Sequence, residues 1–348
     1  MAHVQTVNGP VDPAELGGVL SHEHLLSLTP GPWLSGGPRP RGGERGDREA
    51  FAREQVSLAV SALSGLRAHG IRTVVDLSPY GDAGRDASGA NVALLREVSR
   101  RSGVHIVCGT ATYREGFSPR WVREASVEEI TRRFVEDATT GIAGTGVRAG
   151  ILGEQPTGLG EVTAHELKGL RAAARAHHVT GLAVNTHTTH GTMALEQLDL
   201  LAREAVDLAR VVVGHLDNHP DLDYVRRVLD RGAAIAFDSV GKETWDLRLP
   251  APAGPLPDGP YTKQALRRSD ATRADRIARL VAEGHTERIL LSHDLTGTQV
   301  HLNPATHGRW GYAYLSAVFV PMLAERGVTP AQIHAMLHTN PARLLTIG

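Results

Sequence analysis

The sequence is poor in cysteine, in net charge and in long apolar runs, and each shortage excludes a class of protein. The lone Cys108 rules out an internal disulfide and lies in the apolar run 104–109, which predicts a buried strand residue in a reducing cytoplasm. Lys and Arg (37) nearly balance Asp and Glu (38), so no overall field attracts nucleic acid or an anionic membrane. No apolar run approaches the ~20 residues that span a bilayer, and the first residues do not resemble a secretory signal. We therefore expect a cytoplasmic protein that acts on a small molecule.

Short β-branched runs alternate with longer segments rich in Ala, Leu, Arg and Glu along all 348 residues. Such alternation is typical of βα units around a parallel sheet. The expected strands are the run before His22 and residues 72–77, 105–109, 147–153, 181–186, 210–214, 233–237 and 288–292, with helices at 53–69 and 164–178 among others. Eight units without a compositional break predict an α/β fold, a closed barrel formed by a single domain over residues 1–348.

Two segments rich in Gly and Pro, residues 29–46 and 249–260, are expected to be loops. They follow the first and seventh expected strands. In a βα barrel both would rise from the C-terminal face, where active sites are built, although tolerated surface insertions are the alternative.

His22 and His24 follow the first apolar run, and on a strand residues i and i+2 point to the same side. With 18 histidines in the chain such a pair arises easily by chance. The pair gains weight because further ligand-type residues end other expected strands, namely Glu154, His187, His215 and the dipeptide His293-Asp294. Taken singly, each would more often be a satisfied polar residue or a helix cap. The carboxyl ends of barrel strands converge, however, so together they predict one metal site.

Nitrogen and oxygen donors of this kind suit zinc, manganese, iron or cobalt rather than calcium, which prefers oxygen ligands. Four histidines and two carboxylates are more than one tetrahedral ion needs. They fit two ions about 3.5–4 Å apart, with one carboxylate between them. We therefore expect two divalent metal ions, with zinc first among the candidates.

These motifs together resemble the phosphotriesterase family of the amidohydrolase superfamily. The resemblance rests on Ser21-His22-Glu23-His24 and on residues 150–154, 185–188, 213–215 and 291–294, and it includes residues 70–76, 193–197 and 340–343. It extends from about residue 7 to residue 343. The sequence looks closest to the phosphotriesterase homology protein branch rather than to the organophosphate-degrading enzymes.

The resemblance implies a (β/α)8 TIM barrel with a binuclear metal centre at the C-terminal face of the strands. It assigns the more buried ion to His22, His24 and Asp294, and the more exposed ion to His187 and His215. Many members bridge the ions with a carboxylated lysine, but Gly153 occupies that position here. Glu154, the next residue, is therefore the expected bridging ligand, as in the homology-protein branch.

The expected reaction is hydrolysis by a metal-bridging hydroxide, because two cations lower the pKa of a shared water from ~15.7 towards neutrality. Asp294 is the expected catalytic residue that moves the proton to the leaving group, and a role as ligand alone is the alternative. The family's organophosphate hydrolases carry an Asp and a His as a further proton relay. Asn218 and Ser239 stand at those positions, and lactonases of the family have an Arg where Ser239 stands. An organophosphate or a standard quorum-sensing lactone is therefore disfavoured.

Four residues are candidates for substrate contacts: Tyr113, Lys242, Arg309 and Trp310. The polar composition around them favours a small polar metabolite. We expect cleavage of a carboxylic ester, lactone or amide, with phosphoester hydrolysis (of a phosphodiester or phosphotriester) as the first alternative and a non-catalytic metabolite-binding barrel as the second. Related barrels commonly form dimers, so a homodimer is the assembly that the resemblance implies.

Overall fold

The computed structural model describes residues 2–27, 45–81, 84–242, 269–296 and 311–348, with residues 45–51 described by their backbone alone. Two parallel sheets form its centre. The first sheet has the order β3-β4-β5 and the second the order β10-β9-β8-β7-β6. Their strands are β3 (Gly18–Glu23), β4 (Ile71–Asp76), β5 (His105–Cys108), β6 (Leu152–Thr157), β7 (Val184–Thr188), β8 (Val211–Val213), β9 (Ala234–Phe237) and β10 (Ile289–Leu291).

Single parallel bridges link the two sheets at both of their edges. Gly109 pairs with Ile151 where β5 meets β6, and His24 pairs with Thr296 beyond the ends of β3 and β10. At the second edge, the Asp294 amide donates to the His22 carbonyl at 3.0 Å. Residues far apart in the sequence therefore lie side by side at the C-terminal ends of the strands.

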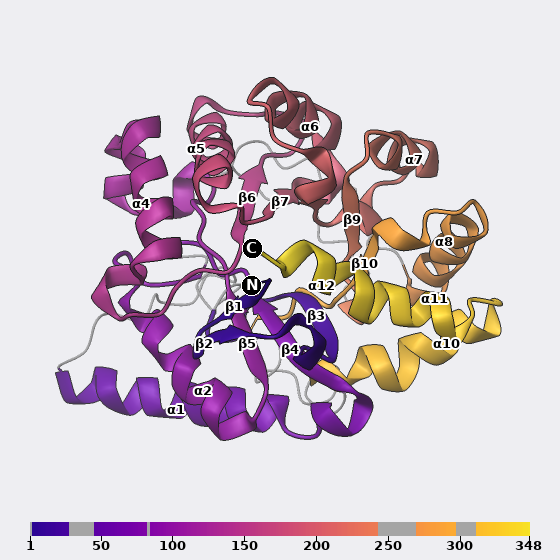
Figure 1. Cartoon of the computed structure of the whole chain (residues 1–348), viewed down its shortest axis with the longest axis horizontal. Coiled ribbons are helices and arrows are strands. Elements are labelled where there is room, and N and C mark those ends of the chain that lie inside the picture. Colours follow the sequence, from indigo (N-terminus) through magenta and orange to yellow (C-terminus); the bar gives the residue numbers. More distant parts are fainter. Residues whose placement is uncertain (1, 28–44, 82–83, 243–268, 297–310) are drawn as a thin grey trace, which may run out of the picture.

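A short antiparallel hairpin, which the sequence pattern did not predict, precedes the parallel strands. It pairs β1 (Val4–Thr6) with β2 (Gly9–Val11). An antiparallel bridge between His3 and Ile347 ties the two ends of the chain together. Both ends lie near the middle of the view in Figure 1.

Helices surround the strands in Figure 1. They are α1 (Arg45–Leu63), α2 (Ala93–Ser102), α3 (Arg120–Glu124), α4 (Val127–Thr139), α5 (Ala164–Thr180), α6 (Ala194–Arg203), α7 (Leu222–Asp230), α8 (Asp270–Ala282), α10 (Val320–Glu325), α11 (Pro330–His334) and α12 (Asn340–Leu345), with π-helical turns at Leu315–Phe319 and Ala335–Thr339. Capping boxes begin α4 at Ser126 and α5 at Thr163, where each hydroxyl accepts from the amide three residues on.

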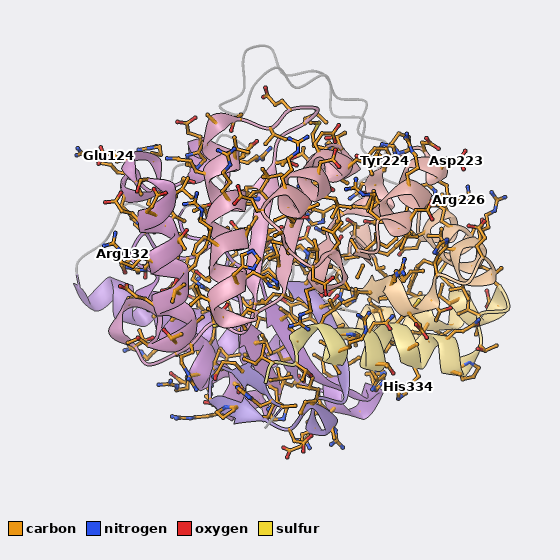
Figure 2. The ribbon with its side chains drawn as sticks, turned by 45° about the horizontal axis from the view of Figure 1, so that its top comes forward. Glu124, Arg132, Asp223, Tyr224, Arg226 and His334 are labelled. Carbon is orange, nitrogen blue, oxygen red and sulfur yellow. The ribbon has the colours of Figure 1, made fainter. Side chains whose placement is uncertain are left out.

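Apolar side chains between the strands and the helices form the core, including Val74, Ile106, Leu198, Ile235 and Leu291, which are all less than 1% exposed. Charged residues such as Glu124, Arg132 and Arg226 lie at the outer rim in Figure 2. Among the described residues, no helix has the length and apolar character needed to cross a membrane.

The structure corrects two of the expected elements. The strand expected at 147–153 begins only at Leu152 and runs to Thr157. Gly150 instead packs against the N-terminal hairpin, where a Cβ would lie 2.4 Å from the Gln5 carbonyl oxygen. The helix expected at 53–69 is broken, because Gly65 takes a left-handed φ of 84° between α1 and the 3-10 turn Leu66–His69.

The other expected strands and the helix at 164–178 are present with ends shifted by a few residues. The loops expected at 29–46 and 249–260 lie outside the described residues, except that residues 45 and 46 belong to α1.

Candidate metal centre

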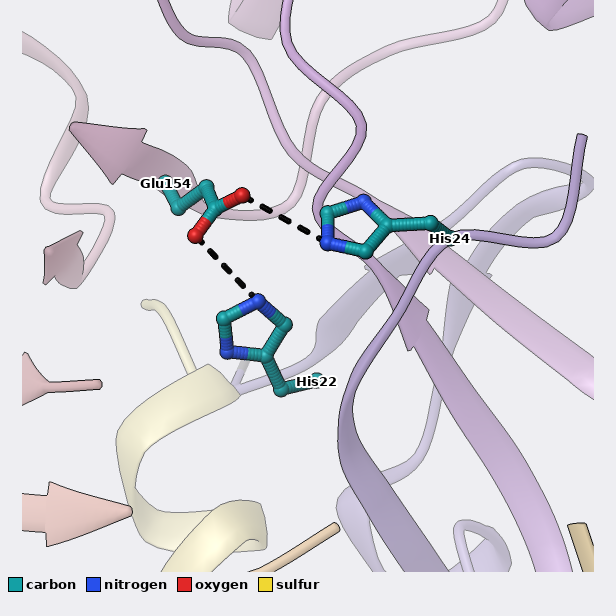
Figure 3. Close-up of side chains that lie close together, drawn as sticks. All are labelled: His22, His24 and Glu154. Atoms are coloured by element: carbon teal, nitrogen blue, oxygen red, sulfur yellow. Dashed lines mark ion pairs between the residues drawn. The ribbon is translucent and has the colours of Figure 1, made fainter. Parts of the chain in front are cut away.

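Six predicted ligands meet at the C-terminal ends of five strands. Glu154 lies at the centre of the group and is only 3% exposed. Its Oε2 lies 3.3 Å from His22 Nε2, and its Oε1 lies 3.4 Å from His24 Nε2 (Figure 3). Each carboxylate oxygen therefore faces one imidazole of the pair at the end of β3.

The other two histidines approach Glu154 from β7 and from the end of β8. His187 Nδ1 lies 2.9 Å from Glu154 Oε2, and His215 Nε2 lies 3.5 Å from the same oxygen. The two imidazole nitrogens are 2.9 Å apart. Asp294 completes the group, since its Oδ1 lies 3.0 Å from His24 Nε2 and 3.7 Å from His22 Nε2. One carboxylate thus faces all four imidazoles.

A register shift turns Glu154 toward the other ligands. β6 pairs with β7 at Leu152, and the pairing resumes at Gln155, which leaves Gly153 and Glu154 outside the regular ladder. At Gly153 a Cβ would lie 2.5 Å from Asn185 Cβ and 2.9 Å from the Asn185 carbonyl oxygen. This backbone therefore has no room for a lysine at Gly153.

His215 and Asp294 both adopt left-handed backbone conformations, with φ of 61° and 53°. Non-glycine residues rarely do so, and such strain persists only where neighbouring contacts enforce it. Here the His215 amide donates to Asp238 Oδ1 at 2.9 Å, and the Asp294 amide donates to the His22 carbonyl. These hydrogen bonds hold the backbone so that each side chain points into the site directly after its strand ends.

Asp238, directly after β9, is a residue of the candidate centre that the sequence reasoning missed. It is fully buried on the side of the imidazoles opposite Glu154. Its Oδ2 lies 2.8 Å from His22 Nδ1, and its Oδ1 lies 2.9 Å from His215 Nδ1. One carboxylate therefore orients two of the expected ligands. The available signal was its place at a strand end, directly after four apolar residues.

Glu23, between the two histidines of β3, points away from the centre and holds the segment that carries Asp294. Its Oε1 accepts from the Ser292 hydroxyl at 2.8 Å and from the His293 amide at 3.0 Å, and its Oε2 accepts from the Leu295 amide at 2.8 Å. His293, beside Asp294, contacts Glu23 through Nδ1 and lies outside the ligand group.

Buried charges shift the pKa values of this group strongly. Burial disfavours the charged form of His22, but Asp238 and Glu154 outweigh it and raise its pKa to about 10. The pKa of His215 is also raised, because Asp238 and Glu154 overcome the effect of burial. Against the effect of burial, the nearby imidazoles hold the pKa of Glu154 well below its usual range. Asp238 and Glu154 therefore stabilise positive charge on the imidazoles that lie between them.

The donor set fits divalent metal ions. With Asp238 on the Nδ1 side of His22 and His215, the neutral tautomers carry a proton at Nδ1 and a lone pair at Nε2. Those lone pairs face Glu154, a group that only accepts hydrogen bonds, and a cation between them relieves the repulsion. Among the described residues, buried His22 Nε2 has no hydrogen-bond partner. Three overlapping groups of these residues place their donor atoms within 4.8 Å of one another.

A cavity of about 220 Å³ opens beside His187, His215 and Asp294. Tyr113 lies next to it, with its hydroxyl 3.4 Å from His187 Nδ1. Lys242 lines the cavity, but its ammonium contacts Asp294 Oδ2. Asn218 and Ser239 also line it and form a 2.9 Å hydrogen bond with each other.

The cavity also includes a residue that the sequence reasoning missed, Arg114, which follows Tyr113 in the segment after β5. Its position directly beside a candidate contact was the available signal. The remaining two candidates, Arg309 and Trp310, lie outside the described residues.

Comparison with known proteins identifies the family. The model of the phosphotriesterase family matches residues 2–345. A phosphotriesterase homology protein of Escherichia coli (strain K12) is 33% identical over 293 residues, which cover 83% of this chain and 89% of that protein. An N-acetyltaurine hydrolase of Tetraodon nigroviridis is 29% identical, with 99% and 97% covered. The solved organophosphorus hydrolase from Deinococcus radiodurans matches with a TM-score of 0.78 at 31% identity, over 99% of this chain and 96% of that one. The chain therefore belongs to the phosphotriesterase family and is a hydrolase of that family.

Proposed function

We propose that this hydrolase holds two divalent metal ions in a closed (β/α)8 barrel formed by residues 1–348 as one domain. The observation that carries the proposal is Glu154, whose carboxylate faces four imidazoles at 2.9–3.5 Å. The bridges at both sheet edges support closure. His22, His24 and Asp294 would hold one ion, His187 and His215 the other, and Glu154 would lie between them. Zinc is the first candidate, with manganese, iron or cobalt as alternatives.

When bound, two such ions lower the pKa of a shared water and polarise the bond to be cleaved. The chain's own residues then position the reacting groups. The two carboxylate oxygens of Asp294 contact different groups: Oδ1 faces His24, and Oδ2 contacts the Lys242 ammonium. Its carboxylate would accept a proton at the cavity edge and pass it to the leaving group. Asn218 and Ser239 bond to each other and carry no charge, so they do not continue a proton relay.

The proposed bond is a carboxylic ester, lactone or amide of a small polar molecule. The N-acetyltaurine hydrolase relative supports an amide, since its named substrate contains that bond. The similarity to a solved organophosphorus hydrolase supports phosphoester cleavage as the alternative. Asn218 and Ser239 favour the first proposal, because the charged relay of the organophosphate enzymes has no counterpart here.

Metal analysis combined with a substrate panel tests this function. We expect about two metal equivalents per chain and hydrolysis that is lost in His187→Ala and Asp294→Ala. His178→Ala is the matched control, because this histidine is exposed on α5, remote from the candidate ligands in the fold, and its Nε2 lies 2.7 Å from the Glu204 carbonyl oxygen. Faster turnover of phosphodiesters or phosphotriesters than of esters, lactones and amides would overturn the choice of bond. Folded protein that holds metabolites but neither metal nor activity would support the non-catalytic barrel.

We further propose a cytoplasmic protein whose partner is a small molecule and that binds neither nucleic acid nor membranes. A homodimer is the proposed assembly. Light scattering after gel filtration should give twice the chain mass of 37.2 kDa, and a mass of one chain would contradict it.

A further inference from the structure

Two neutral side chains on the cavity wall, Asn218 and Ser239, form a hydrogen-bonded pair beside the candidate metal centre. Asn218 follows His215 by three residues, and Ser239 comes directly after Asp238. The Asn218 amide nitrogen and the Ser239 hydroxyl oxygen are 2.9 Å apart. Both side chains line the same cavity as Asp294. A molecule that reaches the candidate centre therefore passes within contact of this pair.

Buried contacts fix the backbone that carries the pair. Asp217 precedes Asn218, and its Oδ2 accepts from Arg273 Nε at 2.7 Å, so this segment is held to α8. Asp238 precedes Ser239 and is fully buried beside two imidazoles. Ser239 itself is only 3% exposed. A pair fixed in this way gives up little freedom when it binds a ligand, which favours tight and specific contact.

The hydroxyl groups elsewhere on the described cavity wall already donate to the backbone. The Thr188 hydroxyl donates to the Gly214 carbonyl at 2.6 Å, and the Thr189 hydroxyl donates to the Thr157 carbonyl at 2.8 Å. Their hydrogens are therefore not offered to a molecule in the cavity.

Asn218 and Ser239, in contrast, keep capacity for both kinds of hydrogen bond. A carboxamide and a hydroxyl together carry three hydrogens and two accepting oxygens. Within the described part of the chain, their mutual bond is the one hydrogen bond that either side chain makes, and it uses one hydrogen and one acceptor. Whichever way round the amide stands, at least one donor and one acceptor are left for a ligand.

We propose that Asn218 and Ser239 form a subsite for a hydroxyl group, so that the substrate is a small ester, lactone or amide with a hydroxyl beside the bond to be cleaved. A hydroxyl donates and accepts through one atom, which matches what the pair offers. A carboxylate has no hydrogen for the remaining acceptor. The cavity of about 220 Å³ is smaller than the ~300–1,000 Å³ typical of pockets for drug-sized ligands, which favours so compact a group. This inference rests on the proposed function and specifies its substrate.

Matched substrates test the subsite in the zinc-loaded protein. Methyl (R)-lactate and methyl (S)-lactate are each compared with methyl propanoate, which lacks only the hydroxyl. We expect the wild type to prefer one lactate ester in kcat/KM. Ser239→Ala should reduce this preference about 2- to 10-fold, the loss typical of one neutral hydrogen bond, mainly by raising the KM of that ester. The control is Ser64→Ala, because Ser64 is exposed and its hydroxyl donates to the Ser61 carbonyl at 2.6 Å.

Asn218→Ala tests whether the two residues act as one subsite. Each single variant should remove most of the preference for the lactate ester, and the double variant should lose little more, because residues that bind one group together are not additive. Full multiplication of the two single losses in the double variant would contradict a shared subsite. Equal proportional changes for the lactate and propanoate esters in Ser239→Ala would overturn it as well.

Direct binding supplies a readout that does not depend on turnover. The ketones 3-hydroxybutan-2-one and butan-2-one contain no bond to hydrolyse and differ by one hydroxyl. In ligand-observed NMR with the zinc-loaded proteins, the hydroxyketone should bind more tightly than butan-2-one to the wild type and to Ser64→Ala, and the difference should shrink in Ser239→Ala. Equal binding of both ketones by the wild type would overturn the subsite. If the wild type hydrolyses none of the esters while the difference between the ketones still depends on Ser239, the proposed function fails and the subsite stands.

Discussion

Two carboxylates define the centre at the scale of single residues, and they act from opposite sides of the same rings. Glu154 faces the Nε2 atoms of His22 and His215, and Asp238 faces their Nδ1 atoms. A carboxylate behind an imidazole fixes its tautomer and strengthens it as a ligand. Because Asp238 serves two histidines from different strands, we expect its loss to affect both metal positions.

Asp238→Ala should lower metal affinity by about 10- to 100-fold, the usual cost of removing such a partner. Competition with a coloured chelator at pH 7.5 measures this change. Asp275→Ala is the control, because Asp275 is exposed and pairs with Arg326 at the surface. Full retention of both metals in Asp238→Ala would show that the contact does not support the ligands.

Gly153 is the second position where a single residue affects the geometry of the site, because its close packing positions the backbone that carries Glu154. Gly153→Ala should destabilise the protein by about 1–3 kcal/mol, since its Cβ would lie 2.5 Å from Asn185 Cβ. Urea unfolding measures the loss. Gly158→Ala is the control, because its backbone φ, like that of Gly153, lies outside the left-handed region, while a Cβ there would meet no atom closer than 3.4 Å. Metal content should also fall in Gly153→Ala, because the displaced backbone carries Glu154. An unchanged unfolding midpoint would contradict the close packing of β6 on β7.

At the scale of elements, a buried arginine on α8 joins two of the segments that follow strands. Arg273 Nε donates at 2.7 Å to Oδ2 of Asp217, which lies two residues after His215, and its Nη1 donates to Asp270 Oδ1 at 2.8 Å. Asp270 Oδ2 in turn accepts from the Gly241 amide at 3.0 Å, next to Lys242. The segments after β8 and β9 are therefore held to one helix.

Arg273→Leu should destabilise the protein by about 3–5 kcal/mol, because it leaves two carboxylates buried without their cation. Arg326→Leu should cost at most about 1 kcal/mol, since its partner Asp275 is 62% exposed. Urea unfolding of both variants gives the comparison. Similar losses in the two variants would mean that the buried network contributes no more than a surface pair.

The alternating pattern predicted the order of the elements, and the resemblance named the family, which the comparison confirmed. The six candidate ligands could be picked out because histidine and carboxylate at strand ends carry a local signal, and the structure brings them together. The sequence pattern failed for the start of β6, which begins late because Gly150 packs against the hairpin. It placed Glu154 in the site but did not show the register shift that turns this side chain inward. Asp238 looks like an ordinary polar residue in sequence, and only its contacts with His22 and His215 place it in the centre. The binuclear centre and the substrate contacts stay predictions.

At the scale of the whole molecule, the candidate metal centre takes its residues from both sheets, so the ionisation of these residues is linked to global stability. Without metal, the raised pKa of His22, about 10, stabilises the fold fully below pH 6.5, its ordinary value. This contribution is lost as the pH rises from 6.5 to about 10. Metal ions need neutral imidazoles, so they should replace the lost contribution in that range.

We therefore expect the metal-free protein to lose thermal stability between pH 6.5 and 9, and the rise in Tm on adding zinc to grow over the same interval. Below about pH 4 both forms should weaken, because the depressed pKa of Glu154 makes its contribution disappear on protonation. Thermal unfolding with zinc or with a chelator measures these changes. One transition is expected if the chain forms the single domain that we propose. A zinc effect that shrinks as the pH rises would contradict this linkage.

The wide spacing of the ligands along the chain also sets when the site is made. His22 and His24 belong to β3, whereas Asp294 follows β10, the last strand. On the ribosome His22 and His24 emerge early, and the ion proposed for them and Asp294 would bind only after nearly all of the chain has been synthesised. Under the proposed function, metal loading would therefore be an event of the finished protein. The metal acquired would then reflect the free ion concentrations around the finished chain, rather than any choice made during synthesis.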